Sequence, residues 1–571
     1  MTGAHGAVAS RLAGSWAALV CAWAITLLGL IFWLATTPEG LLREQLKVAQ
    51  FWSLEACVAL GAVLVAASWR DLLGLSSRAA LAGMACLALL AVFLTLYVAP
   101  RTNRIYYDEQ IYQGIGQNLA DLRRAQMCNE GIVEYGRLHC TMGEYNKQPY
   151  AYPHLLSVGY RLFGVSEAMA TVVNAAALAV SVCAVYLLVI LLFADAVAAA
   201  LAALVLALTP HQLLWSATAA VEPTASMAAL LAVVTAAYFC RARTTVTLCG
   251  AAVAAAWAVQ FRPESALVVP VVTLVIWQGA RDEFRRPRLW WAALLALLLV
   301  AVHLGHLAAV RNEGWGTEDA RLALKYVAGN LRVNGGFYLG DERFPVAFTA
   351  LALVGAFAAR RRGAAVVLHF VLFFGITLFF YAGSYNYGAD VRYSLMTYPA
   401  MAVLAGVGAA TIAAQLTGIL GGLRRARWLV AAALGGQFLW YAPVVRDTTE
   451  EAWAARADVR FAAAAVPALR GNTYVLTHNP GMFHVWGVNA GQMSQVAGNP
   501  SYLDYLATRY TGGVYVHWNF WCNVQVPEQR QLCHVVRALK PMDTVREYRE
   551  RDYAFAFYRL APEAAQQTLN P

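Results

Sequence analysis

Two adjacent carboxylates, Asp108 and Glu109, follow closely on a long apolar stretch that ends near Val98. Beyond them, apolar residues recur every three or four positions between Ile111 and Leu122, which predicts a helix that begins near Asp108 and lies along a membrane surface. A carboxylate held at that depth can take a proton from a water-borne acceptor that attacks a lipid-borne donor. The alternative is that Asp108 only caps the helix, a common role for aspartate.

A second candidate segment, residues 144–154, precedes the next apolar run and contains Lys147, two prolines, three tyrosines and a histidine. Lys147 would bring a positive charge to the level of the lipid headgroups, while the prolines stiffen the approach to the membrane. The alternative is an ordinary aromatic belt in which Lys147 extends its ammonium group toward water. The segment therefore predicts an interfacial structure with or without a role in binding.

Ionisable side chains at the ends of apolar spans form a third group. Arg262 and Glu264 flank a proline, Glu222 precedes another, and Arg392 with Tyr393 opens a late span. Charges at such positions are costly unless they are paired or functional. A guanidinium group is well suited to a phosphate. The alternatives are that Arg262 and Glu264 only pair with each other or cap helices, and that Arg392 only reaches the interface.

The residues above belong to a polytopic membrane protein. The chain has 571 residues, of which 60% are hydrophobic and 13% are charged, whereas soluble domains carry about 25% charged residues. Apolar runs of span length recur along most of the sequence. We predict thirteen spans, at about 15–36, 51–69, 79–98, 168–193, 196–210, 224–240, 246–260, 264–279, 289–309, 344–359, 364–382, 394–416 and 427–445.

The arginines between these spans predict the orientation of the chain. With the N-terminus in the cytoplasm, all but one of the connections expected on the inside contain arginine, as basic-inside topology requires. The net charge of +10 therefore reflects membrane topology, and no nucleic-acid partner is expected. The first apolar run is too long for a signal-peptide core and is predicted to be retained. The segments expected outside are 99–167, 310–343, 383–393 and 446–571, together with the tight connections at 209–223 and 260–264.

The pattern predicts two domains: an all-α membrane domain over residues 1–445, whose outer loop 99–167 carries the carboxylates, and a small extracytoplasmic α/β domain over residues 446–571. Within the second domain, strands are expected at 473–477, 513–518 and 553–558, and a helix at 526–539. No glycine fingerprint or catalytic triad occurs in this tail. We expect it to cover a site or receive an acceptor.

The ten cysteines divide by location. Six lie in or beside apolar spans, where a free cysteine behaves as a small hydrophobic residue. The other four fall on the outer face in two close pairs, which suggests the disulfides Cys128–Cys140 and Cys522–Cys533. Metal binding is the weaker alternative, because no CxxC or histidine-rich spacing accompanies them.

At these motifs the chain resembles the membrane glycosyltransferases of the GT-C type. The Asp-Glu pair, the lysine-proline segment, the Arg-Pro-Glu turn and the Arg-Tyr pair share the order and the side of the membrane seen in that family. The branch most similar contains the protein O-mannosyltransferases and the lipid A aminoarabinose transferase. The similarity spans about residues 79–417. The sequence departs from the family pattern at Lys147-Gln148-Pro149 and in two additional early spans, which leaves the sugar and the acceptor open.

The resemblance implies an inverting transfer of a hexose or pentose from a polyprenyl-phosphate donor to a hydroxyl of a glycan, lipid or protein. Asp108 would be the general base, and Glu109 would orient the base or the acceptor. A fixed cation near the leaving phosphate lowers the barrier, and this role would fall to Lys147, Arg262 and Arg392. The residues expected to contact substrate are Tyr107, Tyr150, Tyr152, His154, Glu222, Glu264 and Tyr393.

Some relatives of that family use a divalent metal and others do not. The sequence shows no clear ligand cluster, so no obligatory cofactor is expected. Composition and predicted topology favour a multi-pass protein of a bacterial inner membrane, with its site on the extracytoplasmic face. Two other functions stay open: a transporter or flippase for a lipid-linked sugar, for which His303, His306 and His369 are the few polar residues inside spans, and a non-catalytic scaffold.

Overall fold

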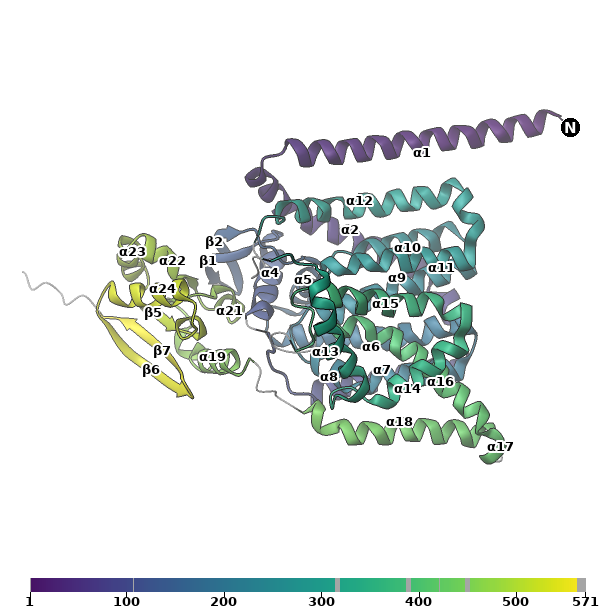
Figure 1. Ribbon diagram of the computed structural model, residues 1–571. Helices are drawn as coiled ribbons and strands as arrows, with labels where there is room; N and C mark the ends of the chain where they lie inside the picture. The colour runs from purple at the N-terminus through teal and green to yellow at the C-terminus, as the bar shows by residue number, and fades with distance from the viewer. Residues whose placement is uncertain are drawn as a thin grey trace, which may run out of the picture. The chain divides into compact units, whose positions relative to one another are not determined.

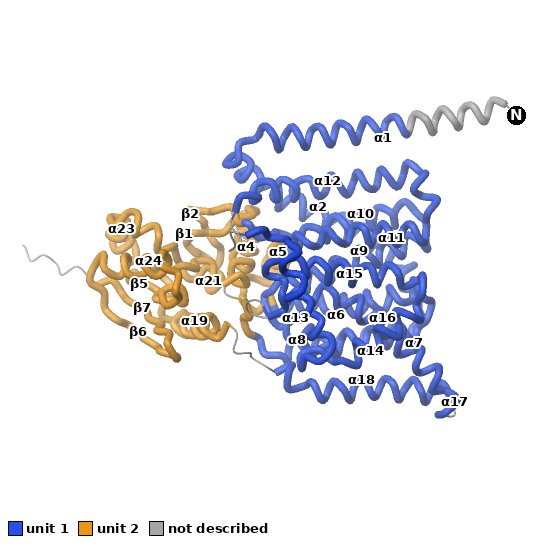
Figure 2. Tube along the Cα trace, viewed as in Figure 1, with its two compact units in different colours: residues 1–101, 147–152, 171–448 blue, residues 102–146, 153–170, 449–571 orange. Residues whose placement is uncertain are grey.

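The computed structural model describes residues 2–105, 107–313, 319–386, 392–420, 422–446 and 452–561. The chain divides into two compact units (Figure 2): unit 1 comprises residues 1–101, 147–152 and 171–448, and unit 2 comprises residues 102–146, 153–170 and 449–571. Residues 387–391 of the predicted outer loop and residues 447–451, beside the predicted domain boundary, lie outside the described residues.

Unit 1 is a bundle of helices (Figure 1), and each of the thirteen predicted spans overlaps one of them. The helices are α1 (Thr2–Thr36), α2 (Glu39–Leu73), α3 (Arg78–Phe93) with η1 (Leu94–Val98), α6 (Ala168–Phe193, whose first residues belong to unit 2), α7 (Ala196–Ala207), α8 (Pro210–Ser216), α9 (Glu222–Ala242), α10 (Thr245–Ala258), η2 (Pro263–Leu267), α11 (Val268–Ala280), η3 (Arg281–Arg285), α12 (Pro287–Ala309), η4 (Leu324–Tyr326), α13 (Val327–Gly340), α14 (Val346–Ala359), η5 (Arg360–Gly363), α15 (Ala364–Phe379), η6 (Arg392–Thr397), α16 (Tyr398–Gln415), α17 (Thr417–Leu420) and α18 (Leu423–Val445).

In the described part of the chain, ten helical stretches are long and apolar enough to cross a membrane, or eleven if the bent pair α7 and α8 forms one span. This count is lower than thirteen for two further reasons. Helix α10 has only 14 residues, and α14 to α15 count as one stretch of 34 residues. The protein is therefore a multi-pass membrane protein, as the sequence predicts.

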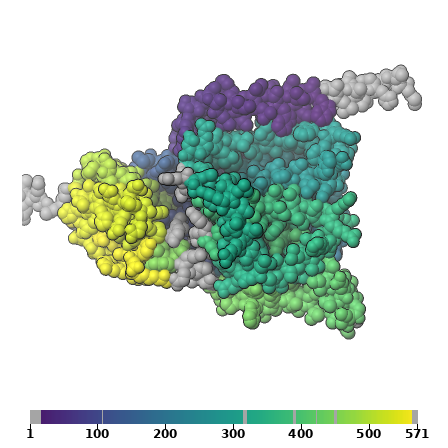
Figure 3. Space-filling view, viewed as in Figure 1, coloured from purple at the N-terminus to yellow at the C-terminus, as the bar shows by residue number. Residues whose placement is uncertain are grey.

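The outer helices of unit 1 expose apolar side chains, as a lipid-facing surface requires. Phe32 is 69% exposed, and Phe357 and Trp440 are each 83% exposed. Figure 3 shows one face of the molecule in space-filling form. Inside the bundle, small residues allow close helix contacts. A Cβ atom added to Gly355 of α14 would overlap the Leu404 carbonyl of α16. Helix packing through small residues thus explains the many alanines of the sequence.

Unit 2 contains one sheet of seven strands in the order β2-β1-β4-β3-β5-β7-β6. Strands β4, β3 and β5 are parallel, and the remaining pairs are antiparallel. The strands are β1 (Met127–Glu134), β2 (Arg137–Glu144), β3 (Thr473–Thr477), β4 (Ala490–Gln492), β5 (Gly513–Trp518), β6 (Met542–Glu550) and β7 (Tyr553–Leu560).

Helices cover both faces of this sheet. On β3, Tyr474 and Leu476 point into a core with α22, α23 and α24, whereas Val475 points into a second core with α19, α20 and α21. This alternation follows the two-residue period of a strand. The helices of unit 2 are α4 (Asp108–Leu122), most of α5 (Ala151–Phe163), α19 (Trp453–Ala463), α20 (Val466–Leu469), α21 (Pro480–Val485), α22 (Met493–Gly498), α23 (Ser501–Arg509), η7 (Phe520–Cys522) and α24 (Pro527–Ala538).

The structure differs from the prediction that the whole loop 99–167 belongs to the membrane domain. Most of the loop joins the C-terminal segment in unit 2. The reason is strand pairing, because β1 pairs with β4 through Glu130 and Gly491. The strands predicted at 473–477 and 513–518 match β3 and β5, while β1, β2, β4 and β6 were not predicted.

Candidate active site

In unit 1, five of the predicted site residues meet at the ends of three helical segments. Arg262 precedes η2 and bonds to Glu264 and to Glu222, the first residue of α9. At the start of η6, the Arg392 Nε atom lies 3.4 Å from Oε1 of Glu222. The Arg262 and Arg392 guanidinium carbons lie 5.2 and 5.5 Å from the centre of the Tyr393 ring. We call Glu222, Arg262, Glu264, Arg392 and Tyr393 the arginine cluster.

The arginine cluster brings two guanidinium groups together around one buried carboxylate. The Glu222 side chain is 1% exposed, and those of Arg262 and Arg392 are 14% and 23% exposed. A buried carboxylate of this kind holds its cationic partners in a defined geometry. Arg262 and Glu264 do not pair only with each other, since Glu222 also pairs with Arg262 and with Arg392. Guanidinium groups fixed side by side can bind the oxygens of a phosphate.

The segment of Lys147 to Tyr152 is fastened inside unit 1. The His306 ring hydrogen-bonds to the Lys147 backbone and lies edge-on to the Tyr150 ring, with 5.4 Å between ring centres. Asn174 donates to the Tyr152 hydroxyl at 3.4 Å. Tyr150 and Tyr152 are buried, as is His154, which belongs to unit 2. Packing explains these three side chains, and their contact with a substrate stays a prediction.

In unit 2, Asp108 is the first residue of α4, in agreement with the predicted start of the helix. The capping position belongs to Tyr107, whose side chain makes no capping hydrogen bond. Asp108 is half-buried, whereas Glu109 is fully buried. The Glu109 Oε1 atom accepts hydrogen bonds from the backbone N–H groups of Arg104 at 2.7 Å and Ile105 at 3.1 Å. Glu109 therefore orders the chain that enters α4.

Helix α4 is more enclosed than the predicted amphipathic helix. Ile115 and Leu119 are buried as expected, but so are Gln113 and Gln117. Gln117 donates to the His484 carbonyl of α21 at 3.3 Å. At the crossing of the two helices, a Cβ atom added to Gly114 would lie 3.2 Å from the Gly481 Cα atom. Glycine at both positions lets α4 pack directly on α21. The spacing of apolar residues did not predict these contacts, because the buried Gln113 and Gln117 lie outside the apolar face of α4.

Tyr107 was predicted to contact substrate, but its side chain packs inside unit 2. It is 4% exposed, and its hydroxyl group donates to Asp458 of α19. Burial and the nearby Asp458 charge raise the Tyr107 pKa well above its ordinary value. The hydroxyl group therefore stays protonated and acts as a donor. Asp458 was not singled out from the sequence, because no motif surrounds it.

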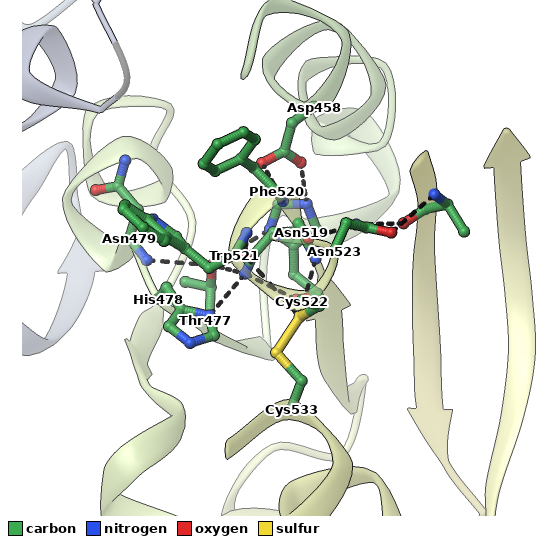
Figure 4. Close-up of a disulfide and its surroundings, with 12 residues drawn as sticks. Asp458, Thr477, His478, Asn479, Asn519, Phe520, Trp521, Cys522, Asn523 and Cys533 are labelled. Atoms are coloured by element: carbon green, nitrogen blue, oxygen red, sulfur yellow. Dashed lines mark hydrogen bonds and ion pairs between the residues drawn. A yellow bond between two sulfur atoms is a disulfide. The ribbon is translucent and has the colours of Figure 1, made fainter. Parts of the chain in front are cut away.

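Both predicted cysteine pairs are bonded in the structure, Cys128 to Cys140 between β1 and β2, and Cys522 to Cys533 between η7 and α24. A ring nitrogen of His478 lies within 4.8 Å of both sulfur atoms of the second pair, and Figure 4 shows this arrangement. The three residues resemble a metal-ligand set only in composition. Sulfur atoms joined in a disulfide are not thiolate ligands.

Unit 1 also contains a cavity of about 540 Å³ beside α13. Its lining combines two arginines, an aspartate, an asparagine and two aromatic side chains. The buried Tyr385 of this lining lies 3.5 Å from the Tyr338 hydroxyl, which bonds to Thr397 of η6 at 2.6 Å. The contacts among Tyr385, Tyr338 and Thr397 therefore link the lining of the cavity to η6, the segment that begins at Arg392. The lining includes Arg332, Arg343, Asp341, Asn386, Phe337 and Tyr385.

Comparisons with known proteins place the fold. Residues 147–306 match the family model described as dolichyl-phosphate-mannose-protein mannosyltransferase. The structure of ArnT from Cupriavidus metallidurans bound to undecaprenyl phosphate aligns with a TM-score of 0.53 at 14% identity, over 86% of this chain and 99% of that one. The chain has the GT-C fold.

A second solved structure supports the same conclusion. The apo oligosaccharyltransferase of Archaeoglobus fulgidus aligns with a TM-score of 0.51 at 12% identity, over 88% of this chain and 76% of that one. No curated protein sequence matches this chain. At these identities the likeness establishes the architecture, and the chemistry has to be argued from the residues themselves.

The predicted site residues thus fall into two groups. Lys147 and the arginine cluster belong to unit 1, whereas Asp108 and Glu109 belong to unit 2. That the two groups serve one reaction stays a prediction. Sequence reasoning found the arginine cluster because charges at span ends are rare and costly. It missed Asp458 and the β1–β2 hairpin, although the Tyr135-Gly136 turn between the two strands, with φ of 51° and 75°, carries a local signal in its glycine.

Proposed function

We propose that the protein is an inverting glycosyltransferase that uses a polyprenyl-phosphate sugar as donor and a hydroxyl group as acceptor. The observation that carries the proposal is the arginine cluster, in which Arg262 and Arg392 meet at Glu222 within a GT-C fold. Three segments far apart in sequence contribute to it. A cluster of this kind at span ends suits the phosphate of a donor that is delivered in the membrane.

The donor phosphate would bind Arg262 and Arg392, with Lys147 as a further cation. As the bond between the anomeric carbon and the phosphate oxygen breaks, negative charge grows on the departing polyprenyl phosphate. Fixed cations stabilise that charge more in the transition state than in the bound donor, so they lower the barrier. A phosphate bound there would accept hydrogen bonds from guanidinium groups that otherwise pair with Glu222 and Glu264.

Asp108 would take the proton from the acceptor hydroxyl while the acceptor oxygen bonds to the anomeric carbon. The products are then the new glycoside, the polyprenyl phosphate and a protonated Asp108. One carboxylate acting on the acceptor gives a single displacement with inversion, since retention usually requires a second carboxylate as nucleophile. Asp108 is half-buried at the start of α4, whereas Glu109 is fully buried and accepts two backbone N–H groups through its Oε1 atom.

The transferred sugar would be a hexose or a pentose, and the acceptor would be a molecule with a hydroxyl group. A hexose or pentose suits the polar cavity beside α13, whose arginine, aspartate and asparagine side chains can bind hydroxyl groups. The acceptor would be a hydroxyl group of a glycan, lipid or protein on the extracytoplasmic face of a bacterial inner membrane. That side follows from the arginine-rich connections expected in the cytoplasm.

The transport alternative receives less support. The His369 ring bonds to the Met396 carbonyl at 2.9 Å, and the His306 ring bonds to the Lys147 backbone. These histidines therefore have partners inside the bundle, as structural residues do. Movement of a lipid-linked sugar across proteoliposomes without any glycosyl transfer would favour transport instead.

The direct test uses the purified full-length protein in nanodiscs, with undecaprenyl-phosphate hexoses and pentoses as donors and an envelope glycolipid extract as acceptor. We expect release of undecaprenyl phosphate together with a glycosylated product. Asp108→Asn should lower the rate by at least about 100-fold, the usual contribution of a general base, in a protein that remains folded. Glu134→Gln, at an exposed position of β1, is the control. Full activity of Asp108→Asn would overturn the assignment.

A further inference from the structure

Asp458 of α19 is a fully buried carboxylate that binds three parts of unit 2. Its Oδ2 atom accepts from the Tyr107 hydroxyl and from the Phe520 backbone N–H at 3.0 Å. Its Oδ1 atom lies 2.9 Å from Nε2 of His517, on β5. A buried carboxylate is costly unless such partners surround it. Figure 4 shows Asp458 beside Phe520.

Tyr107, whose hydroxyl group donates to Asp458, has a backbone conformation that its surroundings must stabilise. Tyr107 adopts φ 47° and ψ −15°, a left-handed conformation that is uncommon for a bulky residue. Its ring packs against Phe520 and Trp521, each with 6.0 Å between ring centres. A strained residue persists only where its surroundings fix it, and such residues gather at functional sites. Here the next residue is Asp108.

Asp108 is thus enclosed by two anchored neighbours. On one side, Tyr107 is bound by Asp458 and by the rings of η7. On the other, Glu109 accepts the Arg104 and Ile105 backbone N–H groups. Neither anchor restrains the Asp108 carboxylate itself, so together they fix the backbone from which it projects.

A network of buried polar groups surrounds His517, which lies against Asp458. The Thr477 hydroxyl lies 3.2 Å from Nδ1 of His517, and Asn519 donates to Thr477 and contacts His478. The Asn519 side-chain oxygen accepts from the Trp521 backbone N–H at 2.9 Å and so shapes η7. The disulfide from Cys522 joins η7 to α24. These contacts connect the ends of β3 and β5 to Asp458, and through Asp458 to the Tyr107 hydroxyl group.

From this geometry we propose that Asp458 and the Tyr107 hydroxyl are positioning residues that set the placement of the Asp108 carboxylate for proton transfer. The inference rests on the proposed function, because it gives the C-terminal segment a part in the reaction assigned to Asp108. A base displaced by about 1 Å can lose about 100-fold in rate, because catalysis depends on near-attack geometry. Donor binding uses other residues, so it should be unaffected.

The test compares Tyr107→Phe, Asp458→Asn and Tyr553→Phe in the full-length protein. Tyr107→Phe keeps the ring contacts and removes only the bond to Asp458. Tyr553 belongs to the same aromatic group but is not a hydrogen-bond partner of Asp458, so Tyr553→Phe is the matched control. We measure kcat, the donor KM with an undecaprenyl-phosphate sugar, and thermal unfolding for each variant.

We expect Tyr107→Phe to lower kcat at least tenfold while the donor KM stays within twofold of the wild type, and Asp458→Asn to lower kcat further. Tyr553→Phe should match the wild type. A Tyr107→Phe variant with wild-type kcat overturns the inference, even if its melting temperature falls, since the hydroxyl group would then serve stability alone. A loss of donor affinity equal to the loss of rate would also overturn it.

The two proposals fail in different ways. If the wild type transfers no sugar and Asp108→Asn changes nothing, the proposed function is wrong. If the wild type transfers sugar and Asp108→Asn abolishes transfer, but Tyr107→Phe is fully active, only the positioning inference is wrong. Should Asp458→Asn fail to fold, Tyr107→Phe still decides the question, because it removes a single hydroxyl group.

Discussion

The two units prepare their candidate residues by different physical means. In unit 1, Arg262 and Arg392 are held by charge, through ion pairs with Glu222 and Glu264. In unit 2, Asp108 is held by its neighbours, through the buried Tyr107–Asp458 contact and the backbone bonds of Glu109. The arginine cluster thus depends on ion pairs, whose partners a ligand can replace. The position of Asp108 depends instead on a fixed backbone.

This difference suits two tasks. A phosphate can be bound by any geometry that offers enough donors and positive charge, and ion pairs can release those donors when the ligand arrives. Proton transfer requires the carboxylate within hydrogen-bond reach of one hydroxyl group. Changes in unit 1 should therefore alter donor binding as well as the rate, whereas changes in unit 2 should alter the rate at saturating donor with little effect on donor binding.

The largest effect is expected from the arginine cluster. Arg262→Gln and Arg392→Gln each remove a charged hydrogen-bond donor, worth about 1.5–3 kcal/mol, which corresponds to a loss of about 10- to 150-fold in donor affinity. Binding of undecaprenyl phosphate to protein in nanodiscs measures this directly. Arg361→Gln, at an exposed position between α14 and α15, should bind normally. Unchanged affinity in both cluster variants would remove the phosphate assignment.

The next effect concerns the disulfide that joins η7 to α24. Replacing Cys522 and Cys533 by serine should destabilise unit 2 by about 2–4 kcal/mol, and kcat should fall because η7 packs on Tyr107. Removing the Cys128–Cys140 disulfide is the comparison, since that pair fastens the β1–β2 hairpin. Thermal unfolding and kcat are measured together. Equal losses of kcat in the two variants would show that η7 has no special part.

A smaller effect is expected where α4 crosses α21. Gly114→Val places a branched side chain against the Gly481 backbone, where a Cβ atom would already lie at 3.2 Å. Overpacking of this kind costs about 1–3 kcal/mol, and a shift of α4 should lower kcat with little change in donor affinity. Gly498→Ala, where a Cβ atom meets no neighbour, is the control. Retention of both stability and kcat in Gly114→Val would argue against tight packing of α4.

The smallest effect is a dependence of stability on pH. Burial lowers the pKa of His478 and of His484 from 6.5 to about 4. The unfolded chain therefore binds more protons than the folded one between these values, so stability falls as the pH drops from about 6.5 toward 4. Melting temperatures of the full-length protein at pH 7, 6 and 5 measure the trend.

The corresponding variant is His484→Gln, which should flatten this pH trend, whereas His139→Gln, at an exposed position of β2, should leave it unchanged. A melting temperature that stays constant from pH 7 to pH 5 in the wild type would show that neither buried histidine limits stability in acid.

The membrane fold was largely predictable from the sequence. Apolar length gave helices at all thirteen expected places, and the disagreement in count concerns short or adjoining helices such as α10 and α14. The start of α4 at Asp108 followed from apolar spacing alone. These features are local, since each depends on residues within one or two helical turns.

Unit 2 was harder to predict because its contacts are distant in sequence. The pairing of Glu130 with Gly491 and the contact of Tyr107 with Asp458 carry no local signal. The exposed strand β6 was missed because both of its faces are polar or mixed. For the same reason the arginine cluster was found from span ends, whereas the residues that hold Asp108 became visible only in the structure.

The central claim is that one reaction joins the base at Asp108 to a phosphate bound by Arg262 and Arg392. A cryo-electron microscopy structure of the protein with undecaprenyl phosphate tests it most directly. The account predicts phosphate oxygens about 3 Å from both guanidinium groups, at hydrogen-bond distance, and the Asp108 carboxylate facing the same enclosed space. A phosphate bound elsewhere, or an Asp108 carboxylate directed away from it, would contradict the account.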